Sequence, residues 1–216
     1  MRPALIDSEK ALAAALAGLT ARDGLMRALV AHGVRPQLRK RAPGLPGLLS
    51  VVVSQQISTA SAAAIWARVE VELAPLAPDA ILAAPDEAFR RAGLSGPKVR
   101  AVRAIARAVA DGTLPIDRLH ELDADMAHAR LTAVSGIGPG TADVYLLFCL
   151  GHADAFAAGD LALQEAARLA FDLEARPSAR DLLALAERWR PWRGVAARVL
   201  WAYYRQAKGR EGAPSA

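Results

Sequence analysis

Three glycines within five residues mark the stretch of this sequence whose residue types could bind an anion. Gly136 and Gly138 flank Ile137, and Gly140 follows two residues later, just before Thr141. A turn of this composition can adopt backbone angles that a side chain would forbid. Its successive amides and the unpaired N–H groups of a helix beginning there would form a concave phosphate site. The same spacing also fits an ordinary helix connector, because GxG turns are common.

A lone acid follows the apolar run after these glycines. Asp160 directly precedes LALQEAARLAF, whose apolar spacing predicts an amphipathic helix. Aspartate is favoured immediately before a helix, so a capping role alone would explain it. A fixed negative charge in a partly dry cleft would also stabilise a developing cation, and the helix dipole would favour that charge. On residue type and position alone, a helix cap is the simplest explanation of Asp160, and a further role of its charge is compatible with it.

Helical periodicity dominates the elements that must position these residues. No alternating strand pattern with a hairpin turn is present, so we predict an all-α fold of about ten helices. Ser8, and Thr20 together with Asp23, are interpreted as caps of the first two helices. The run from Leu48 to Val71 predicts a long buried helix, with a broken helix as the alternative. Further helices are expected over residues 86–92, 97–111, 125–133 and 161–171, after Ser178, and over 192–209.

Composition indicates a globular chain of one or two domains, with 216 residues and 53% hydrophobic content. The net charge of +5 favours a polyanionic partner, although arginine-rich composition can also reflect codon bias. The single cysteine, Cys149, excludes a disulfide framework and lies in an apolar run, which indicates a core residue. The four histidines lack zinc-ligand spacing. No apolar run approaches the roughly 20 residues of a membrane span, so we expect a cytoplasmic protein without membrane contact.

The glycine turn and the acid together resemble the helix-hairpin-helix DNA glycosylases, in which a leucine helix, GIG or GVG, and Thr-Ala precede a catalytic aspartate. The resemblance implies that Asp160 is catalytic. It also implies that the hairpin binds a DNA phosphate through Gly136, Ile137, Gly138, Gly140 and Thr141. A monovalent K⁺ or Na⁺ would be held by the backbone carbonyls of Thr132, Val134 and Ile137. No other cofactor is implied, and one cysteine excludes the four-cysteine iron-sulfur cluster of some members.

Three further segments extend the resemblance over nearly the whole chain and are similar to the alkylpurine branch, the DNA-3-methyladenine glycosylase II type. They are SQQIS at 54–58, GLSGPKVRAVRAIA at 93–106 and AERWRPWRGVAARVLWAYY at 186–204. This branch implies a base-pocket role for Trp201, Gln55 and Gln56, each of which could instead only pack or cap. Bifunctional members carry a lysine just before the hairpin threonine, where this chain has Gly140. A monofunctional mechanism, with water as nucleophile and no AP-lyase activity, is therefore implied.

The chain also departs from this branch. A well-known large member lines its pocket with aromatic residues at the positions of Gly140, Val144 and Ala202, and it carries an N-terminal β-rich extension that this chain lacks. The resemblance implies two helical subdomains flanking a cleft. One comprises residues 48–152 and contains the helix-hairpin-helix at 131–148, and the other comprises 1–47 plus 153–208. A disordered tail is expected at 209–216.

The resemblance implies a monomeric, nucleoid-associated base-excision repair glycosylase that acts on double-stranded DNA. It would flip an alkylated purine of the 3-methyladenine or 7-methylguanine class and hydrolyse its N-glycosidic bond, leaving an abasic site. The cationic base would stack on Trp201. A wedge side chain, Leu38 or Leu45, is expected from the basic loop at 34–47, which is alternatively a solvated linker. The alternatives are a glycosylase for another damaged-base class, or a non-catalytic helix-hairpin-helix DNA-binding module.

Overall fold

The structure is a computed structural model and describes residues 4–209, so the predicted tail lies, apart from Gly209, outside the described residues. Within this range twelve α-helices confirm the all-α prediction, and an isolated bridge joins Leu5 and His152. No helix in this range is both long and apolar enough to cross a bilayer. The first six helices are α1 (Glu9–Arg22), α2 (Gly24–Ala31), α3 (Gly44–Ser54), α4 (Thr59–Glu72), α5 (Pro78–Ala83) and α6 (Asp86–Ala92). The others are α7 (Gly96–Ala110), α8 (Ala124–Thr132), α9 (Pro139–Val144), α10 (Leu161–Ala170), α11 (Ala179–Ala186) and α12 (Arg193–Lys208).

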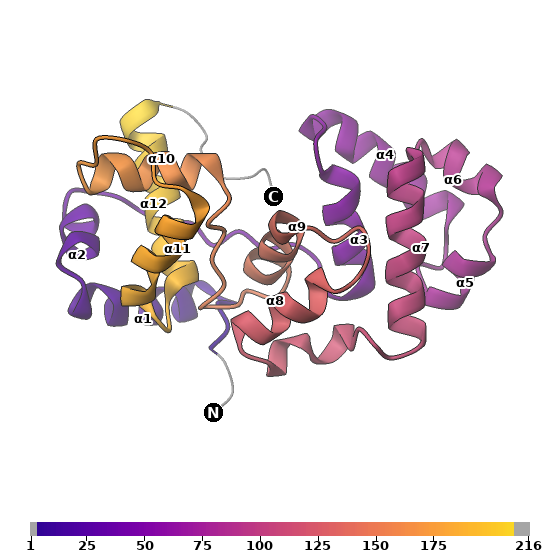
Figure 1. The fold of residues 1–216 in the computed structure, drawn as a ribbon, viewed down its shortest axis with the longest axis horizontal. Helices are drawn as coiled ribbons and strands as arrows, with labels where there is room; N and C mark the ends of the chain where they lie inside the picture. The colour runs from indigo at the N-terminus through magenta and orange to yellow at the C-terminus, as the bar shows by residue number, and fades with distance from the viewer. Residues whose placement is uncertain (1–3, 210–216) are drawn as a thin grey trace.

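The helices lie in two groups (Figure 1). Helices α3 to α7 form one group, in which α5 packs on α7 and α4 on α6. The other group contains α1, α2, α10, α11 and α12, with α12 packed against α10 and α1. Helices α8 and α9 lie between the two groups in this view. The described chain therefore begins and ends in the same group, and it crosses between the groups in the segments 32–43 and 150–160.

The predicted caps hold at Ser8, Asp23 and Ser178, each of which accepts a hydrogen bond from the backbone N–H three residues later. The capping role predicted for Thr20 is wrong. Helix α1 continues to Arg22, and the Thr20 hydroxyl donates to the carbonyl of Leu16 inside that helix (2.9 Å). A threonine hydroxyl can bond back to the preceding turn, so it satisfies itself without ending the helix.

The predicted long helix from Leu48 to Val71 is broken, as the alternative allowed. Helix α3 ends at Ser54 and α4 begins at Thr59. Gln55 is extended and Gln56 has a left-handed φ of 59°, so both residues lie in a turn rather than on a helix. The Ser58 hydroxyl then caps α4 by accepting from the Ser61 N–H (3.2 Å). The break places the glutamine pair at the surface between two helices.

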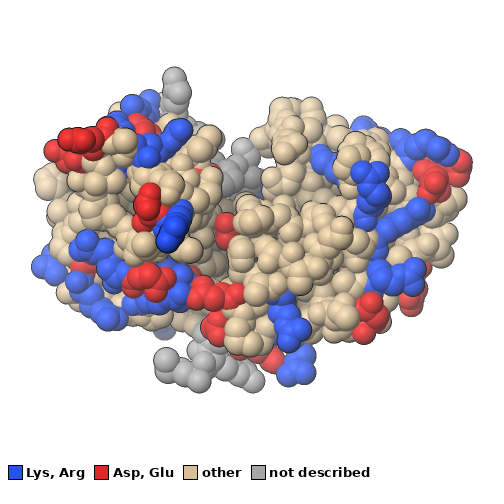
Figure 2. Space-filling model, in the orientation of Figure 1, with Lys and Arg blue, Asp and Glu red and all other residues tan. Residues whose placement is uncertain are grey.

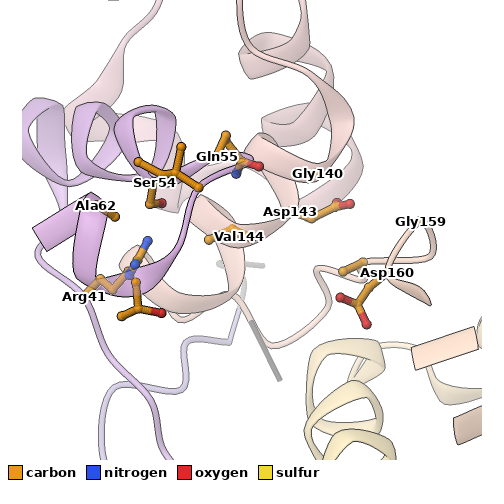
Figure 3. Close-up of a pocket in the computed structure, with 12 residues that line it drawn as sticks. Arg41, Ser54, Gln55, Ala62, Gly140, Asp143, Val144, Gly159 and Asp160 are labelled. Carbon is orange, nitrogen blue, oxygen red and sulfur yellow. The ribbon is translucent and has the colours of Figure 1, made fainter. Parts of the chain in front are cut away.

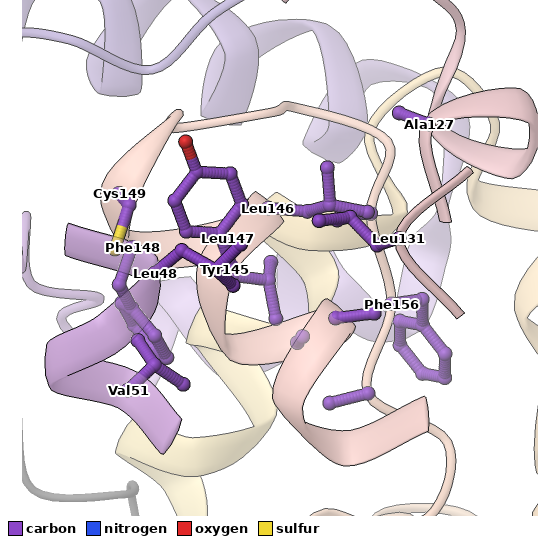
Figure 4. Close-up of a cluster of buried hydrophobic side chains, with 14 of the residues drawn as sticks. Leu48, Val51, Ala127, Leu131, Tyr145, Leu146, Leu147, Phe148, Cys149 and Phe156 are labelled. Carbon is purple, nitrogen blue, oxygen red and sulfur yellow. The ribbon is translucent and has the colours of Figure 1, made fainter. Parts of the chain in front are cut away.

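The hairpin's second helix runs into the centre of the core. Helix α9 continues as a fully buried π-helical turn, Tyr145–Cys149, which packs on α3 and α8 (Figure 4). Leu48 and Val51 of α3 and Leu131 of α8 belong to the same cluster. Burial raises the pKa of the Cys149 thiol to about 12, which opposes nucleophilic chemistry at neutral pH. The interpretation of Cys149 as a core residue is confirmed.

An ion-pair network connects the C-terminal helix to α8 and to the segment that leads to Asp160. Arg193 at the start of α12 is 2% exposed and donates to Asp154 (3.0 Å), Asp125 (2.7 Å) and Glu187 (3.1 Å). Arg190 pairs with the same three acids. Asp125 lies on α8, which leads into the glycine hairpin, and Asp154 lies in the segment that leads to Asp160. The network therefore fixes the position of the hairpin relative to Asp160.

Candidate active site

Asp160 is the N-cap of α10, so its capping role is confirmed. Its Oδ1 accepts the Leu163 backbone N–H (2.7 Å) and also the indole Nε1–H of Trp201 (2.9 Å). Two donors on one oxygen fix the plane of the carboxylate and leave Oδ2 outside these two bonds. The Asp160 carboxylate also lines a cavity, so capping and chemistry are compatible at this residue.

The cavity beside Asp160 has a volume of about 410 Å³, which suits a nucleobase. Figure 3 shows its wall formed by the α3–α4 turn and α9, facing the segment that ends at Asp160. The structure thus brings Gln55, Gly140 and Asp160 together, as predicted, but Gln56 is not part of the wall. The lining residues are Arg41, Ser54, Gln55, Ile57, Thr59, Ala62, Gly140, Asp143, Val144, Ala157, Gly159 and Asp160.

Trp201 lies behind Asp160 rather than in the wall of this cavity. Its side chain is 1% exposed, and its ring packs against Phe148 with centroids 5.8 Å apart. The indole N–H donates a hydrogen bond to the Asp160 carboxylate. In this arrangement Trp201 positions the Asp160 carboxylate. Both faces of its ring are covered, so the structure does not support the predicted stacking of a base on Trp201.

The predicted phosphate hairpin is exposed where an anion would approach. Gly136 has a φ of 90°, and a Cβ there would lie 2.4 Å from the Cβ of Ala101 on α7, so this position requires glycine. Ile137 is buried and anchors the turn. Gly138 and Gly140 are exposed, with open space around the position of a Cβ. Phosphate binding by this turn stays a prediction.

The carbonyls predicted to hold a monovalent cation lie at the C-terminal end of α8 and in the following turn. The carbonyl of Val134 accepts the N–H of Ile137 (3.1 Å), which closes the turn. A helix C-terminus presents unpaired carbonyls at the negative end of its dipole, so this chemistry fits K⁺ or Na⁺. Among residues 4–209, no group of three or more His, Cys, Asp or Glu side chains is arranged for a metal ion.

The two leucines predicted as wedge candidates are not free at the surface. Leu45 lies in the first turn of α3 and is 6% exposed, because the last four residues of the predicted loop 34–47 are helical. Leu38 is half-buried against the core. Ile57, in contrast, is 37% exposed and lines the cavity next to the Gln55–Gln56 turn. The signal available in the sequence was a large apolar residue between the polar residues of SQQIS.

A second carboxyl in the cavity was missed by sequence reasoning. Asp143 lies on α9, is 7% exposed, and lines both the cavity beside Asp160 and a second cavity of about 600 Å³. The His128 Nε2 is 3.4 Å from its Oδ1. Burial raises the pKa of Asp143 to about 7, with Asp160 raising it further and Arg193 opposing. The sequence signal that could have identified Asp143 was its position as the only charged residue in the apolar run TADVYLLF.

The charged residues of the face shown in Figure 2 do not form one basic patch. Lys and Arg gather over the outer ends of the two helical groups, and the middle over α8 and α9 is mostly uncharged. The Lys and Arg side chains on this face are therefore spread over separate regions. Net charge alone does not locate a DNA-binding surface.

Comparisons with known proteins agree with the helical fold described above. Residues 49–191 match the family model described as HhH-GPD superfamily base excision DNA repair protein. DNA-3-methyladenine glycosylase 1 of Schizosaccharomyces pombe is 30% identical over 158 residues, 71% of this chain and 69% of that protein. A crystal structure of DNA-3-methyladenine glycosidase from Bacillus halodurans has a TM-score of 0.82 at 28% identity, covering 97% of this chain and 95% of that one. The S. pombe 3-methyladenine DNA glycosylase in complex with abasic DNA has a TM-score of 0.70 at 27% identity, covering 90% and 96%.

The helical architecture, the hairpin and the acid define a helix-hairpin-helix glycosylase fold. The chain belongs to the HhH-GPD superfamily of base excision DNA repair proteins. It spans between 21% and 33% of the length of the first curated relatives it matches.

Proposed function

We propose that this protein is a DNA glycosylase that removes alkylated purines from double-stranded DNA. The observation that carries the proposal is the Asp160 carboxylate, oriented by two hydrogen bonds at the edge of a cavity of nucleobase size. The relatives named 3-methyladenine glycosylases support the lesion class. A pure DNA-binding module has no use for a fixed acid beside a polyanion.

In the proposed reaction the damaged nucleotide rotates out of the duplex into the cavity, at an unstacking cost of a few kcal/mol. The glycosidic bond breaks with its electron pair on the base, and positive charge develops on the sugar. Asp160 stabilises that charge and orients the attacking water through Oδ2, because Oδ1 is occupied by Leu163 and Trp201. The water oxygen bonds to the sugar C1′, and the proton that it loses passes to Oδ2 of Asp160 and then to solvent. The hairpin amides hold a backbone phosphate, and a cation at the Thr132, Val134 and Ile137 carbonyls would supply positive charge there.

The direct test is release of free bases from methylated duplex DNA by the purified protein. We expect 3-methyladenine and 7-methylguanine in the supernatant and alkali-labile abasic sites in the DNA. Bound but intact methylated DNA would favour the binding-module alternative. Release of other damaged bases alone would favour another lesion class.

We further propose a monofunctional mechanism, which the Gly140→Lys substitution tests. Gly140 lines the cavity and open space surrounds the position of its Cβ, so a lysine there fits and can approach the flipped sugar. We expect borohydride to trap a covalent protein–DNA adduct with Gly140→Lys and none with the wild type, since a Schiff base needs a primary amine. Gly138→Lys, in similarly open space outside the cavity wall, is the matched control. Adduct formation by the wild type would contradict the monofunctional assignment.

We propose Ile57 as the wedge that fills the space left by the flipped nucleotide. It is exposed at the cavity entrance, on the turn that carries Gln55. Ile57→Ala should slow excision of a base-paired lesion by about tenfold, because an apolar wedge offsets part of the unstacking cost. Excision from an unpaired position should change much less, since less stacking is lost there. Equal loss on both substrates in single-turnover assays would argue against a wedge, and Val71→Ala on exposed α4 is the control.

A further inference from the structure

Asp143 has no role in the mechanism above, although it faces the same cavity as Asp160. It projects from α9 toward the Gly159–Asp160 segment (Figure 3) and is 7% exposed. The Nε2 atom of the His128 ring lies 3.4 Å from its Oδ1, which is longer than a normal hydrogen bond. Arg193, whose charge also acts on it, donates its hydrogen bonds to Asp154, Asp125 and Glu187. Burial disfavours the charged form of this carboxyl and also the charged form of the neighbouring His128 ring.

The remaining chemistry of the cavity indicates what would complement this carboxyl. The lining residues include no aromatic ring, and Trp201 is covered and committed to Asp160. A cationic base in this cavity therefore has no aromatic face to contact. Among the lining side chains, the ionisable groups are the carboxyls of Asp143 and Asp160 and the guanidinium of Arg41. Charge is thus the means of recognition that this wall offers.

We propose that Asp143 is a specificity-determining residue that selects cationic over neutral damaged purines by its charge. Alkylation at N3 or N7 of a purine in DNA leaves the base cationic, and the attraction ends when the bond breaks and the base leaves neutral. Asp143 forms no bond to the substrate, so its effect falls on kcat/KM and on binding of the flipped base. The inference rests on the proposed glycosylase function.

The charge on Asp143 depends on pH within the physiological range. Its pKa is raised to about 7 by burial, so the carboxylate form predominates at pH 8 and the neutral form at pH 6. Burial lowers the pKa of His128, so that ring is neutral at pH 7 and above. We therefore expect the preference for cationic bases to rise as pH increases through 7. The charged or titratable groups around Asp143 are His128 and Asp125 of α8, Asp160, Arg180 of α11, Arg193 of α12 and Arg41.

The test measures single-turnover release of 7-methylguanine and of neutral hypoxanthine from matched duplexes at pH 6 and pH 8. For Asp143→Asn we expect 7-methylguanine release at subsaturating enzyme to fall at least tenfold at pH 8 and less than threefold at pH 6. The rate of hypoxanthine release by Asp143→Asn should not fall below that of the wild type. Asp143→Glu should recover part of the loss at pH 8, which a packing defect would not allow. Asp79→Asn, exposed on α5, is the matched control.

Equal losses of 7-methylguanine release at both pH values, or an equal loss of hypoxanthine release, would overturn the inference. Wild-type release that depends on Asp160 but not on Asp143 would overturn this inference alone. No 7-methylguanine release by the wild type would overturn the proposed function, and the inference with it.

Discussion

Asp160→Asn should abolish base release while leaving DNA binding and folding intact. Asparagine remains a favoured N-cap, and its side-chain oxygen can still accept from Leu163 and Trp201. The negative charge that stabilises the developing sugar cation is lost, so we expect a fall in the rate of at least about 10²-fold. Free-base release from methylated DNA under single-turnover conditions measures the rate, and fluorescence anisotropy on the same duplex measures binding.

The controls for this variant separate chemistry from structure. A thermal melt should place Asp160→Asn close to the wild type, because the cap is preserved. Asp79→Asn, at an exposed position on α5, should keep full activity. Normal excision of alkylated purines by Asp160→Asn would show that another group supplies the charge.

Arg193→Ala should cause the largest loss of stability among single substitutions in the ion-pair network. The Arg193 side chain is 3% exposed, and its removal leaves Asp154, 14% exposed, with the more exposed Arg190 as its remaining ion-pair partner. Breaking a buried pair by removing one member costs about 3–5 kcal/mol. We expect the free energy of unfolding in urea to fall by about that amount. Because the network joins α12 to α8 and to the segment before Asp160, the loss should reach the whole fold.

Arg90→Ala is the matched control for the network. Arg90 pairs with Glu87 on the surface of α6, and both side chains are more than half exposed. Exposed pairs contribute about 0–1 kcal/mol, so this variant should remain near the wild type. If Arg193→Ala lost no more stability than Arg90→Ala, the network would not stabilise the packing of α12 against α8 and the segment before Asp160.

Local signals in the sequence predicted the helices well where a cap and an apolar stripe coincide. Ser8, Asp160 and Ser178 each begin a helix as expected, because a side-chain oxygen close to unpaired N–H groups is a purely local interaction. The capping prediction for Thr20 failed because its hydroxyl can donate to a backbone carbonyl of the preceding helical turn. The exact break at Gln55–Ser58 depends on a left-handed Gln56, a conformation that glutamine rarely adopts and that its neighbours do not announce.

The sequence by itself determined the all-α class, the family, the position of the glycine hairpin and the helix cap at Asp160. These features rest on short motifs and local periodicity. Only the tertiary structure decided which side chains face the cavity. It placed Trp201 behind Asp160, buried Leu45, and brought Asp143 and Ile57 to the cavity wall. The reason is that helical spacing defines an apolar face, whereas the side chains that border a cavity depend on how separate helices pack against each other.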